Sequence, residues 1–438
     1  MRSVAATALL APMKIRSVFF SFARLATGEV FGRMATFALF AYVSRYFGVQ
    51  VLGIVALAQT VASYVMELSD QGLRLIGARI LARNAELVSY VVSFVLKRRA
   101  VLTVVAVSFG ALYAAVGPIP SDARVCVLAF DLAVVPYAFA LDWVAWGLGH
   151  FGVLSLWRSG VSIVYVGLAV VAMRLTMRPI ASISGANLLS ALLGAGFLWA
   201  IWKLRWSRTY SQQPPESLRI SATDELRPKR VFALGLSNLL NLVFMNADIL
   251  LLGAITTTHE VGRYSAACKP LYVIFAGFWL LTDTLYPLLA KLEAGPHAHG
   301  VLLLALAGLA VLAASAALIL GILAPRILTL IYGSTLGAAG LFRILLIALP
   351  LDFCFSLLWT VLVSRGYDRA VLYSLATAAT VNIGLNLAFI PRFQANAAAW
   401  ATVASYALLF LAVLIFVLRH KVLASAEKSD SIAAPAWA

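Results

Sequence analysis

The sequence predicts an all-α protein that crosses a membrane many times. Hydrophobic residues make up 62% of the 438-residue chain and charged residues only 12%, against about 25% charged residues in soluble domains. The mean hydropathy is +0.94. Apolar runs close to the ~20 residues that a membrane-spanning helix needs recur along the chain. This pattern excludes a soluble domain held by a single anchor.

We expect about twelve membrane-spanning helices, six in each half of the chain, because each apolar run is long enough to cross a bilayer. The predicted spans lie near residues 17–44, 50–73, 100–117, 123–148, 152–173, 179–203, 230–255, 262–290, 300–324, 338–363, 369–390 and 396–418.

A polar stretch that contains prolines, residues 204–228, lies at the midpoint of the chain and is predicted to be a cytoplasmic linker. It separates an N-lobe, residues 17–203, from a C-lobe, residues 229–419. Residues 1–16 are interpreted as a cytoplasmic leader, with the start of the protein at Met1 or Met13. Residues 420–438 are predicted to be a disordered cytoplasmic tail.

Basic residues outnumber acidic ones, 34 to 18, for a net charge of +16. They concentrate in the loops that share a side with the N-terminus, which places both termini in the cytoplasm by the positive-inside rule. No basic run is long enough to indicate nucleic-acid binding. The three cysteines lie in apolar segments without metal-ligand spacing, so neither a metal site nor a disulfide framework is predicted.

The two halves of the chain resemble each other. LSDQGLRLIGARIL (68–81) parallels LTDTLYPLLAKL (281–292), which aligns Asp70 with Asp283, and Val51-Leu52-Gly53 parallels Glu260-Val261-Gly262. Six helices per half is an even number, so both halves enter the membrane from the same side. This arrangement indicates a parallel repeat, and transporters built from such repeats bind substrate between the halves.

Four basic residues within the predicted spans are candidates for an anionic ligand: Arg24, Arg33, Arg158 and Lys269. Arg24 has no acid in register within one turn, so it either snorkels to the interface or faces a wet cavity. Arg33 follows Glu29 at the i,i+4 spacing of an intrahelical pair, which leaves simple neutralisation open. The acid on the face of Lys269, Asp283, is about 21 Å further along the helix, too far to pair.

A second group of charges lies near the predicted cytoplasmic end of the N-lobe. Glu67, Asp70 and Arg74 fall within about 60° of one another on a helical wheel. They form either a charge network that locks the helix to its neighbours or a proton-coupling site. Asp131 is the best intramembrane acid of the fourth span, and Arg158 faces either a phosphate or Asp142.

Polar residues on the seventh predicted span form a third candidate group. Asn238, Asn241 and Asp248 fall within about an 80° arc. Such a stripe either faces a polar cavity or makes hydrogen bonds to neighbouring helices.

Four blocks of the sequence resemble polysaccharide-unit flippases of the Wzx type, in the multidrug/oligosaccharidyl-lipid/polysaccharide exporter superfamily. The first block is YFGVQVLGIVALAQTVASYVMELSDQGL, and it is followed by GAR. The other three cover residues 246–292, 332–353 and 365–393. Together the blocks cover nearly the whole chain in the expected order, and they are more specific for the superfamily than for the substrate.

This resemblance implies two six-helix lobes in a V and alternating access. It implies export of undecaprenyl-pyrophosphate-linked oligosaccharide across a bacterial inner membrane, for O-antigen, capsule or exopolysaccharide. No cofactor is expected, although coupling to H⁺ or Na⁺ is open. The expected interaction partners are the anionic lipids of the membrane, a polysaccharide polymerase and a chain-length regulator.

The resemblance also suggests roles for the candidate residues. Arg24 and Lys269, with Arg33 and Arg158, would hold the pyrophosphate. Asn238, Asn241 and Asp248 would face the glycan. Coupling or gating would fall to five charged residues: Glu67, Asp70, Arg74, Asp131 and Asp283. The family often has Arg where this chain has Lys269, and a lysine binds phosphate as a point charge rather than bidentately.

The sequence fits two other functions less well. A cation-driven drug exporter of the same superfamily should have a cavity dominated by acids, whereas the best cavity candidates here are bases. A membrane glycan polymerase or ligase needs a large external loop with catalytic residues, and the external loops predicted here are short.

Overall fold

The computed structural model describes residues 15–210, 214–290, 296–365 and 367–420. Side chains are described within these ranges except at residues 15–27, 29, 208, 229, 230, 233, 277, 279–290, 296–299, 364 and 368. The described ranges are helical throughout apart from short turns, and they contain no strand.

The helices, in chain order, have the following bounds: α1 Ile15–Asp70, α2 Leu73–Arg83, η1 Ala85–Leu87, α3 Val88–Val116, α4 Ser121–Ala138, α5 Asp142–Gly147, α6 Phe151–Thr176, α7 Pro179–Ile201, η2 Trp202–Trp206, α8 Ser207–Thr209, α9 Glu216–Glu225, α10 Pro228–Ile255, α11 Thr258–Ala290, α12 Pro296–Tyr332, α13 Ala339–Leu346, α14 Ala348–Ser364, α15 Asp368–Phe393 and α16 Ala395–Arg419.

The long helix α1 contains two of the predicted spans. Its helical geometry is interrupted at Gly48, where φ is 85° and ψ is 173°. A residue with a side chain rarely adopts this conformation, whereas glycine does so at little cost. The chain therefore turns here, and the arms 15–47 and 49–70 correspond to the predicted spans at 17–44 and 50–73.

Nine helical stretches in the described ranges are long and apolar enough to cross a membrane. The first of them, residues 30–70, covers both sides of the Gly48 bend. Helix α4 is not among the nine, because Asp122, Arg124 and Asp131 lower its hydropathy. Counting the two arms of α1 separately and adding α4 and α11 gives the twelve expected spans. The predicted all-α fold of two six-helix lobes is confirmed.

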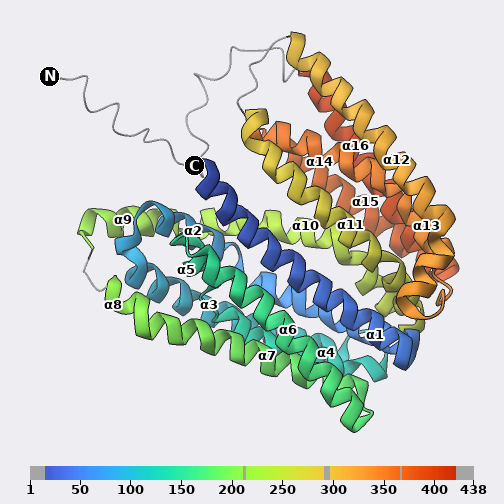
Figure 1. Cartoon of the computed structure of the whole chain (residues 1–438), viewed down its shortest axis with the longest axis horizontal. Helices are drawn as coiled ribbons and strands as arrows, with labels where there is room; N and C mark the ends of the chain where they lie inside the picture. The colour runs from blue at the N-terminus through green and yellow to red at the C-terminus, as the bar shows by residue number, and fades with distance from the viewer. Residues whose placement is uncertain (1–14, 211–213, 291–295, 366, 421–438) are drawn as a thin grey trace.

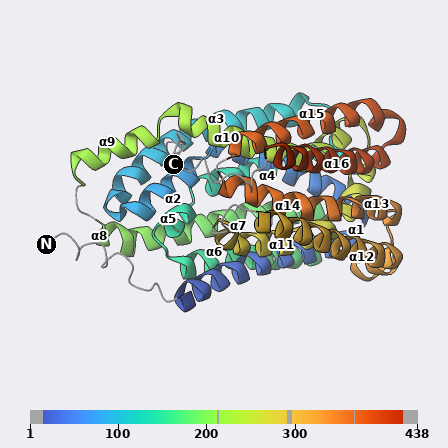
Figure 2. The same cartoon turned by 90° about the horizontal axis from the view of Figure 1, so that it is seen from above.

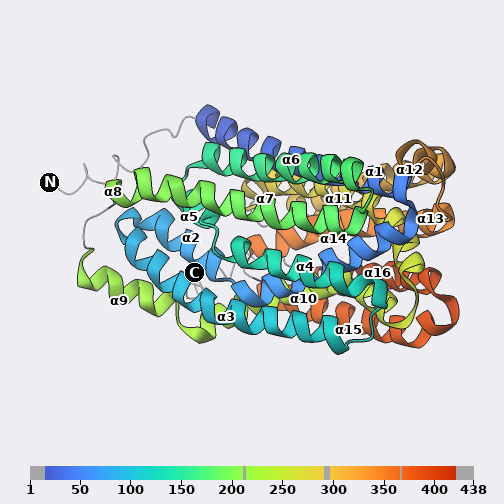
Figure 3. The same cartoon turned by 90° about the horizontal axis from the view of Figure 1, so that it is seen from below.

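The two lobes splay apart in a V (Figure 1). Helices α1 to α7 form one lobe, and α10 to α16 form the other. The lobes converge at the end of the molecule where α13 lies and diverge towards the opposite end. Views from above and below show the same elongated bundle, with α9 at one end and the α12–α13 hairpin at the other (Figures 2 and 3).

At the convergent end the lobes meet through two glycines. A Cβ atom on Gly53 would overlap the Thr258 carbonyl oxygen, and one on Gly262 would overlap the Val49 carbonyl oxygen. The contact is reciprocal, as expected for two matching surfaces related by a two-fold axis. These glycines belong to the segments that the sequence comparison of the two halves paired with each other.

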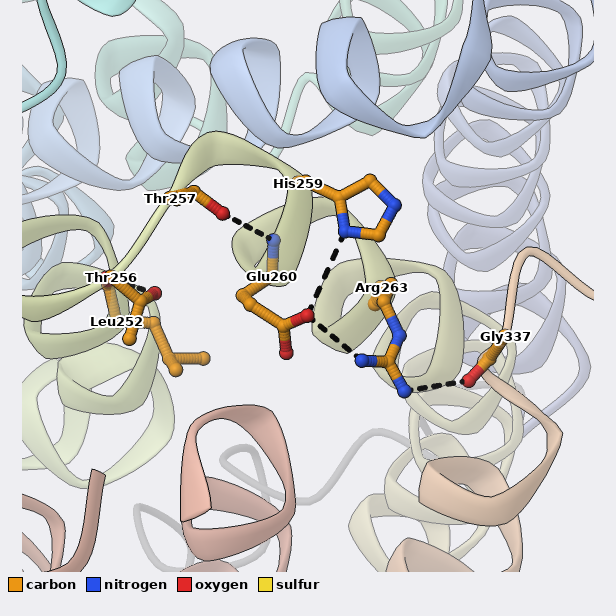
Figure 4. A network of polar contacts seen from close by, with 7 residues as sticks. All are labelled: Leu252, Thr256, Thr257, His259, Glu260, Arg263 and Gly337. Carbon is orange, nitrogen blue, oxygen red and sulfur yellow. Dashed lines mark hydrogen bonds and ion pairs between the residues drawn. The ribbon is translucent and has the colours of Figure 1, made fainter. Parts of the chain in front are cut away.

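Polar groups hold the same end together. Asp122 of α4 accepts hydrogen bonds from Gln50 at 2.9 Å and from Thr258 at 3.2 Å, so it links the two lobes. Arg263 pairs with Glu260 at 2.8 Å and donates to the carbonyl oxygen of Gly337 at 3.1 Å (Figure 4). The beginning of α11 is thereby tied to the loop that precedes α13.

The structure corrects one of the predicted elements and adds detail to another. The span predicted at 123–148 is two helices, α4 and α5, with a break at residues 139–141. Pro136 has no N–H group for the carbonyl of Leu132, which weakens the last turn of α4. Within the break, the Trp199 indole donates a hydrogen bond of 3.0 Å to the carbonyl oxygen of Phe139. The predicted linker is also partly ordered, because it contains α9, which packs on the N-lobe through Ala222.

We predict that Gly262→Val separates the lobes at the convergent end, because the added side chain overlaps the α1 backbone. Cysteines introduced at Gln50 and Thr258 should then cross-link several-fold less efficiently in membranes. Gly384→Val is the matched control, since a Cβ there meets nothing within 4 Å. Equal cross-linking in the two variants would contradict a close glycine crossing.

Candidate functional site

A cavity of 480 Å³ lies between α1, α6 and α11. Three of its lining residues are cations: Arg33 of α1, Arg158 of α6 and Lys269 of α11. The described lining contains no acid, and the side chain of nearby Glu29 lies outside the described part of the chain. Three of the four basic candidates, which come from both lobes, therefore line one cavity.

Small residues bring α1 and α6 together along this cavity. A Cβ on Gly32 would lie 2.9 Å from the Ser162 hydroxyl oxygen, and one on Gly28 would overlap Ser155. Glycine–serine contacts of this kind let membrane helices approach closely. The approach places Arg33 and Arg158 on the same cavity wall, and both have partners within the protein.

Lys269 is held in place by two contacts with the N-lobe. Its ammonium donates to the Gln59 side-chain oxygen at 3.0 Å and lies 4.2 Å from the centroid of the Phe40 ring. A neutral amide and an aromatic face orient the ammonium without neutralising it. The positive charge of Lys269 is thus available to an anion in the cavity.

A second cavity of 440 Å³ continues from the first, because the two share lining residues such as Thr36, Gln59 and Tyr137. Its lining adds Asn187 and a single acid, Glu67. The joined space is therefore basic at one end and acidic at the other, with hydroxyl and amide groups in between.

Asp70 and Arg74 belong to a charge network within the N-lobe rather than to this cavity. Asp70 lies 3.3 Å from the Nε atom of Arg99, which is completely buried, and it also accepts a hydrogen bond from the Arg74 backbone N–H. The Arg74 guanidinium pairs with Asp142. The network joins α1, α2, α3 and α5, which agrees with the interpretation of these charges as a lock.

Two other acids of the N-lobe, Asp142 and Asp131, are both buried. Asp142 pairs with Arg74 and not with Arg158, because the turn before α5 directs it towards α2. Asp131 is 1% exposed and faces α3, where a Cβ on Gly110 would lie 2.6 Å from its carboxylate. It lines none of the cavities described here.

The three polar candidates of α10 do not share one site. Asn238 and Asn241 line a separate 320 Å³ cavity in the C-lobe, together with Asp352 of α14. Asp248 is buried and accepts hydrogen bonds from Asn386 at 2.6 Å, Tyr264 at 2.6 Å and Thr402 at 2.7 Å. It connects α10, α11, α15 and α16, so its place is between helices rather than on a cavity wall.

Two of the predicted residues, Arg24 and Asp283, lie outside the part of the chain whose side chains are described. Their roles stay predictions.

The sequence reasoning missed Arg99 and Asp352. Arg99 ends the run Lys97-Arg98-Arg99, which lies directly before the span predicted at 100–117 and so falls in a predicted loop. In the structure α3 starts at Val88, so Arg99 lies inside the helix and is buried. Asp352 could have been found from the sequence, because it is the one acid in the span predicted at 338–363, within LPLDF.

A family model matches more than half of the chain. A family model described as "Polysaccharide biosynthesis protein" matches residues 21–293. No curated protein matches the sequence significantly.

Solved structures match the fold over most of the chain. The inward closed lipid II flippase MurJ has a TM-score of 0.69 at 13% identity, covering 90% of this chain and 87% of the other. An inward-facing multidrug resistance MATE family transporter gives 0.65 at 14% identity, covering 90% and 96%. A mutant of the Vibrio cholerae MATE transporter VcmN gives 0.56 at 12% identity, covering 94% and 99%.

We predict that Asp70→Asn destabilises the N-lobe by about 3–5 kcal/mol, because it leaves the buried Arg99 guanidinium without its counter-ion. Thermal unfolding of the purified protein in detergent measures the loss. Asp224→Asn is the control, because its pair with Arg227 is exposed and such pairs contribute at most about 1 kcal/mol. Adding Arg99→Met to Asp70→Asn should restore part of the stability, and a further loss would contradict the lock.

Proposed function

The chain belongs to the polysaccharide biosynthesis protein family, and from this membership we propose that it flips undecaprenyl-pyrophosphate-linked oligosaccharide units across the bacterial inner membrane. The coarser conclusion, a multi-pass membrane flippase or transporter, follows from the family match, the apolar helices and the fold. The carrier lipid, the inner membrane and the surface polysaccharide pathway are part of the proposal.

The observation that carries the proposal is the convergence of Arg33, Arg158 and Lys269 on one cavity between the lobes. A pyrophosphate presents several anionic oxygens close together. Arginine binds such oxygens with two parallel hydrogen bonds, while lysine acts as a point charge. Lys269 is the C-lobe member of the group, so a bound pyrophosphate would link the two lobes.

The polar groups of the joined cavity suit the sugar part of the substrate. Thr36, Gln59, Tyr137 and Asn187 offer hydroxyl and amide groups beside the cations. Asn238 and Asn241 line the separate C-lobe cavity and would contact the glycan only in another conformation of the lobes. Asp248 is removed from the proposed glycan contacts, because its hydrogen bonds to neighbouring helices hold it within the C-lobe.

Alternating access is the mechanism we propose. With both termini in the cytoplasm, the convergent end of the V is the external end, and the Gly53–Gly262 crossing closes it. The cation cavity then receives substrate from the cytoplasmic side. Opening the crossing and closing the other end of the V would release the substrate outward.

Two alternative functions are less well supported by the site. A drug exporter for cationic compounds should present acids to its substrate, whereas the central cavity presents three cations. For a polymerase or ligase, the turns and loops between the described helices are too short to form an external catalytic domain. We therefore propose a transporter without catalytic residues.

For ion coupling, we propose that Glu67 is the proton carrier among the predicted carboxylates. Asp70 is neutralised by Arg99, and Asp248 accepts three side-chain hydrogen bonds, so both already have partners. Glu67 and Asp131 each have a buried carboxylate oxygen without a hydrogen-bond partner in the described part of the chain. Of these two acids, Glu67 is the one that lines a described cavity. Sodium coupling is the competing possibility.

We predict that Lys269→Gln and Arg158→Gln each reduce substrate export about tenfold or more, since one charged hydrogen bond contributes about 1.5–3 kcal/mol. Surface polysaccharide and lipid-linked repeat units on the cytoplasmic leaflet would be measured in cells with equal protein levels. Lys269→Arg should retain export, because the charge is kept. Arg205→Gln, at an exposed site outside the cavity, is the neutral control; normal export by both cavity variants would refute the assignment.

We predict that Glu67→Gln abolishes the stimulation of transport by a proton gradient while leaving substrate binding intact, because the amide cannot release a proton. Reconstituted vesicles with and without a pH gradient provide the measurement. Asp224→Asn, on the exposed helix α9, should respond like the unaltered protein. A response to sodium instead, unaffected by Glu67→Gln, would exclude proton coupling at this residue.

A further inference from the structure

A groove on the outer face of the C-lobe contains Arg343, an exposed arginine near the start of the candidate membrane span Ala339–Val363. The groove lies between α12 and α13–α14, has a volume of 600 Å³ and is lined by apolar residues apart from Arg343. Leu318 and Ile322 of α12 line it and are 66% and 68% exposed. It faces the surroundings of the bundle rather than the space between the lobes, so it is separate from the cation cavity.

A proline positions Arg343 at this groove. Pro325 lies inside α12 and has no N–H group, so the carbonyl of Gly321, four residues earlier, loses its helical donor. The Nε atom of Arg343 donates to that carbonyl at 2.9 Å. This hydrogen bond ties α13 to α12 and directs the guanidinium across the groove, with its two Nη atoms still able to donate.

The positive charge of Arg343 has no counter-ion in the described ranges, where the Gly321 carbonyl is its hydrogen-bond partner. Between residues 296 and 367 the sequence contains one acid, Asp352, which is 2% exposed and lines the C-lobe cavity instead. Arg326 follows Ile322 by one turn on the same face of α12 and is also exposed. The groove is therefore flanked by two arginines.

A charge that faces lipid is costly unless an anionic group or water reaches it. The phosphate of a membrane lipid is such a group, and a guanidinium can bind two of its oxygens at once. An acyl chain of the same molecule matches the apolar groove. We propose that this groove binds an anionic phospholipid, with its phosphate on Arg343, assisted by Arg326, and one acyl chain against α12. This inference is independent of the proposed transport function.

Native mass spectrometry of the delipidated full-length protein tests the proposal. The probes are phosphatidylglycerol, zwitterionic phosphatidylethanolamine, uncharged diacylglycerol and undecaprenyl phosphate. Phosphatidylglycerol should bind best, and Arg343→Gln should reduce its binding about tenfold, in line with the loss of a charge-assisted phosphate contact. Arg392→Gln is the matched control, because it removes an exposed arginine at the end of α15, outside the groove.

Two further variants keep the test valid if Arg343→Gln disturbs α12. Ala317→Trp fills the groove and keeps both arginines, and Arg326→Gln keeps the Arg343–Gly321 hydrogen bond. Both should weaken phosphatidylglycerol binding while the protein stays monodisperse. Three results would overturn the proposal: unchanged binding in Arg343→Gln and Ala317→Trp, diacylglycerol binding as tightly as phosphatidylglycerol, or full displacement of phosphatidylglycerol by equimolar undecaprenyl phosphate.

Discussion

The close crossing of α1 and α11 at Gly53 and Gly262 is the constraint on which the rest of the structure depends. Because neither residue has a side chain, two backbones from different lobes touch at the convergent end. The lobes then splay from this contact, and the cation cavity occupies the space further along α1 and α11. Asp122 and Arg263 add polar links around the crossing, and polar links can be broken and remade when the lobes move.

Charge within the bundle is divided between two tasks. In the N-lobe, Asp70, Arg74, Arg99 and Asp142 neutralise one another and join four helices. Around the central cavity, Lys269 is held by an amide and an aromatic ring, so its charge is oriented but retained. The first arrangement stabilises a lobe, and the second suits the recognition of an anion. The N-lobe charges face partners of opposite sign, and Lys269 faces a polar cavity, so neither group leaves a charge in apolar surroundings.

The difference between these groups explains which contacts could be anticipated from the sequence. Lys269 was identified because no acid lies in register with it on its own helix, which is a local property. The partner of Asp142 and the surroundings of Asp248 depend on residues up to 154 positions away in the sequence, and helical periodicity carries no information about them. Arg99 was missed because the start of α3 was placed twelve residues too late, which turned a buried cation into a loop residue.

The sequence alone determined the membrane class, the number of spans, the matching halves and the basic character of the central cavity. These properties follow from the lengths of the apolar runs and the positions of the charged residues, which can be read directly from the sequence. Only the tertiary structure decided which charges neutralise each other, that Asn238 and Asn241 face a cavity of their own, and that Asp248 is bound between helices. It also showed that Arg343 meets the carbonyl freed by Pro325. Each of these depends on which helix faces which, and that is settled by packing between segments far apart in the sequence.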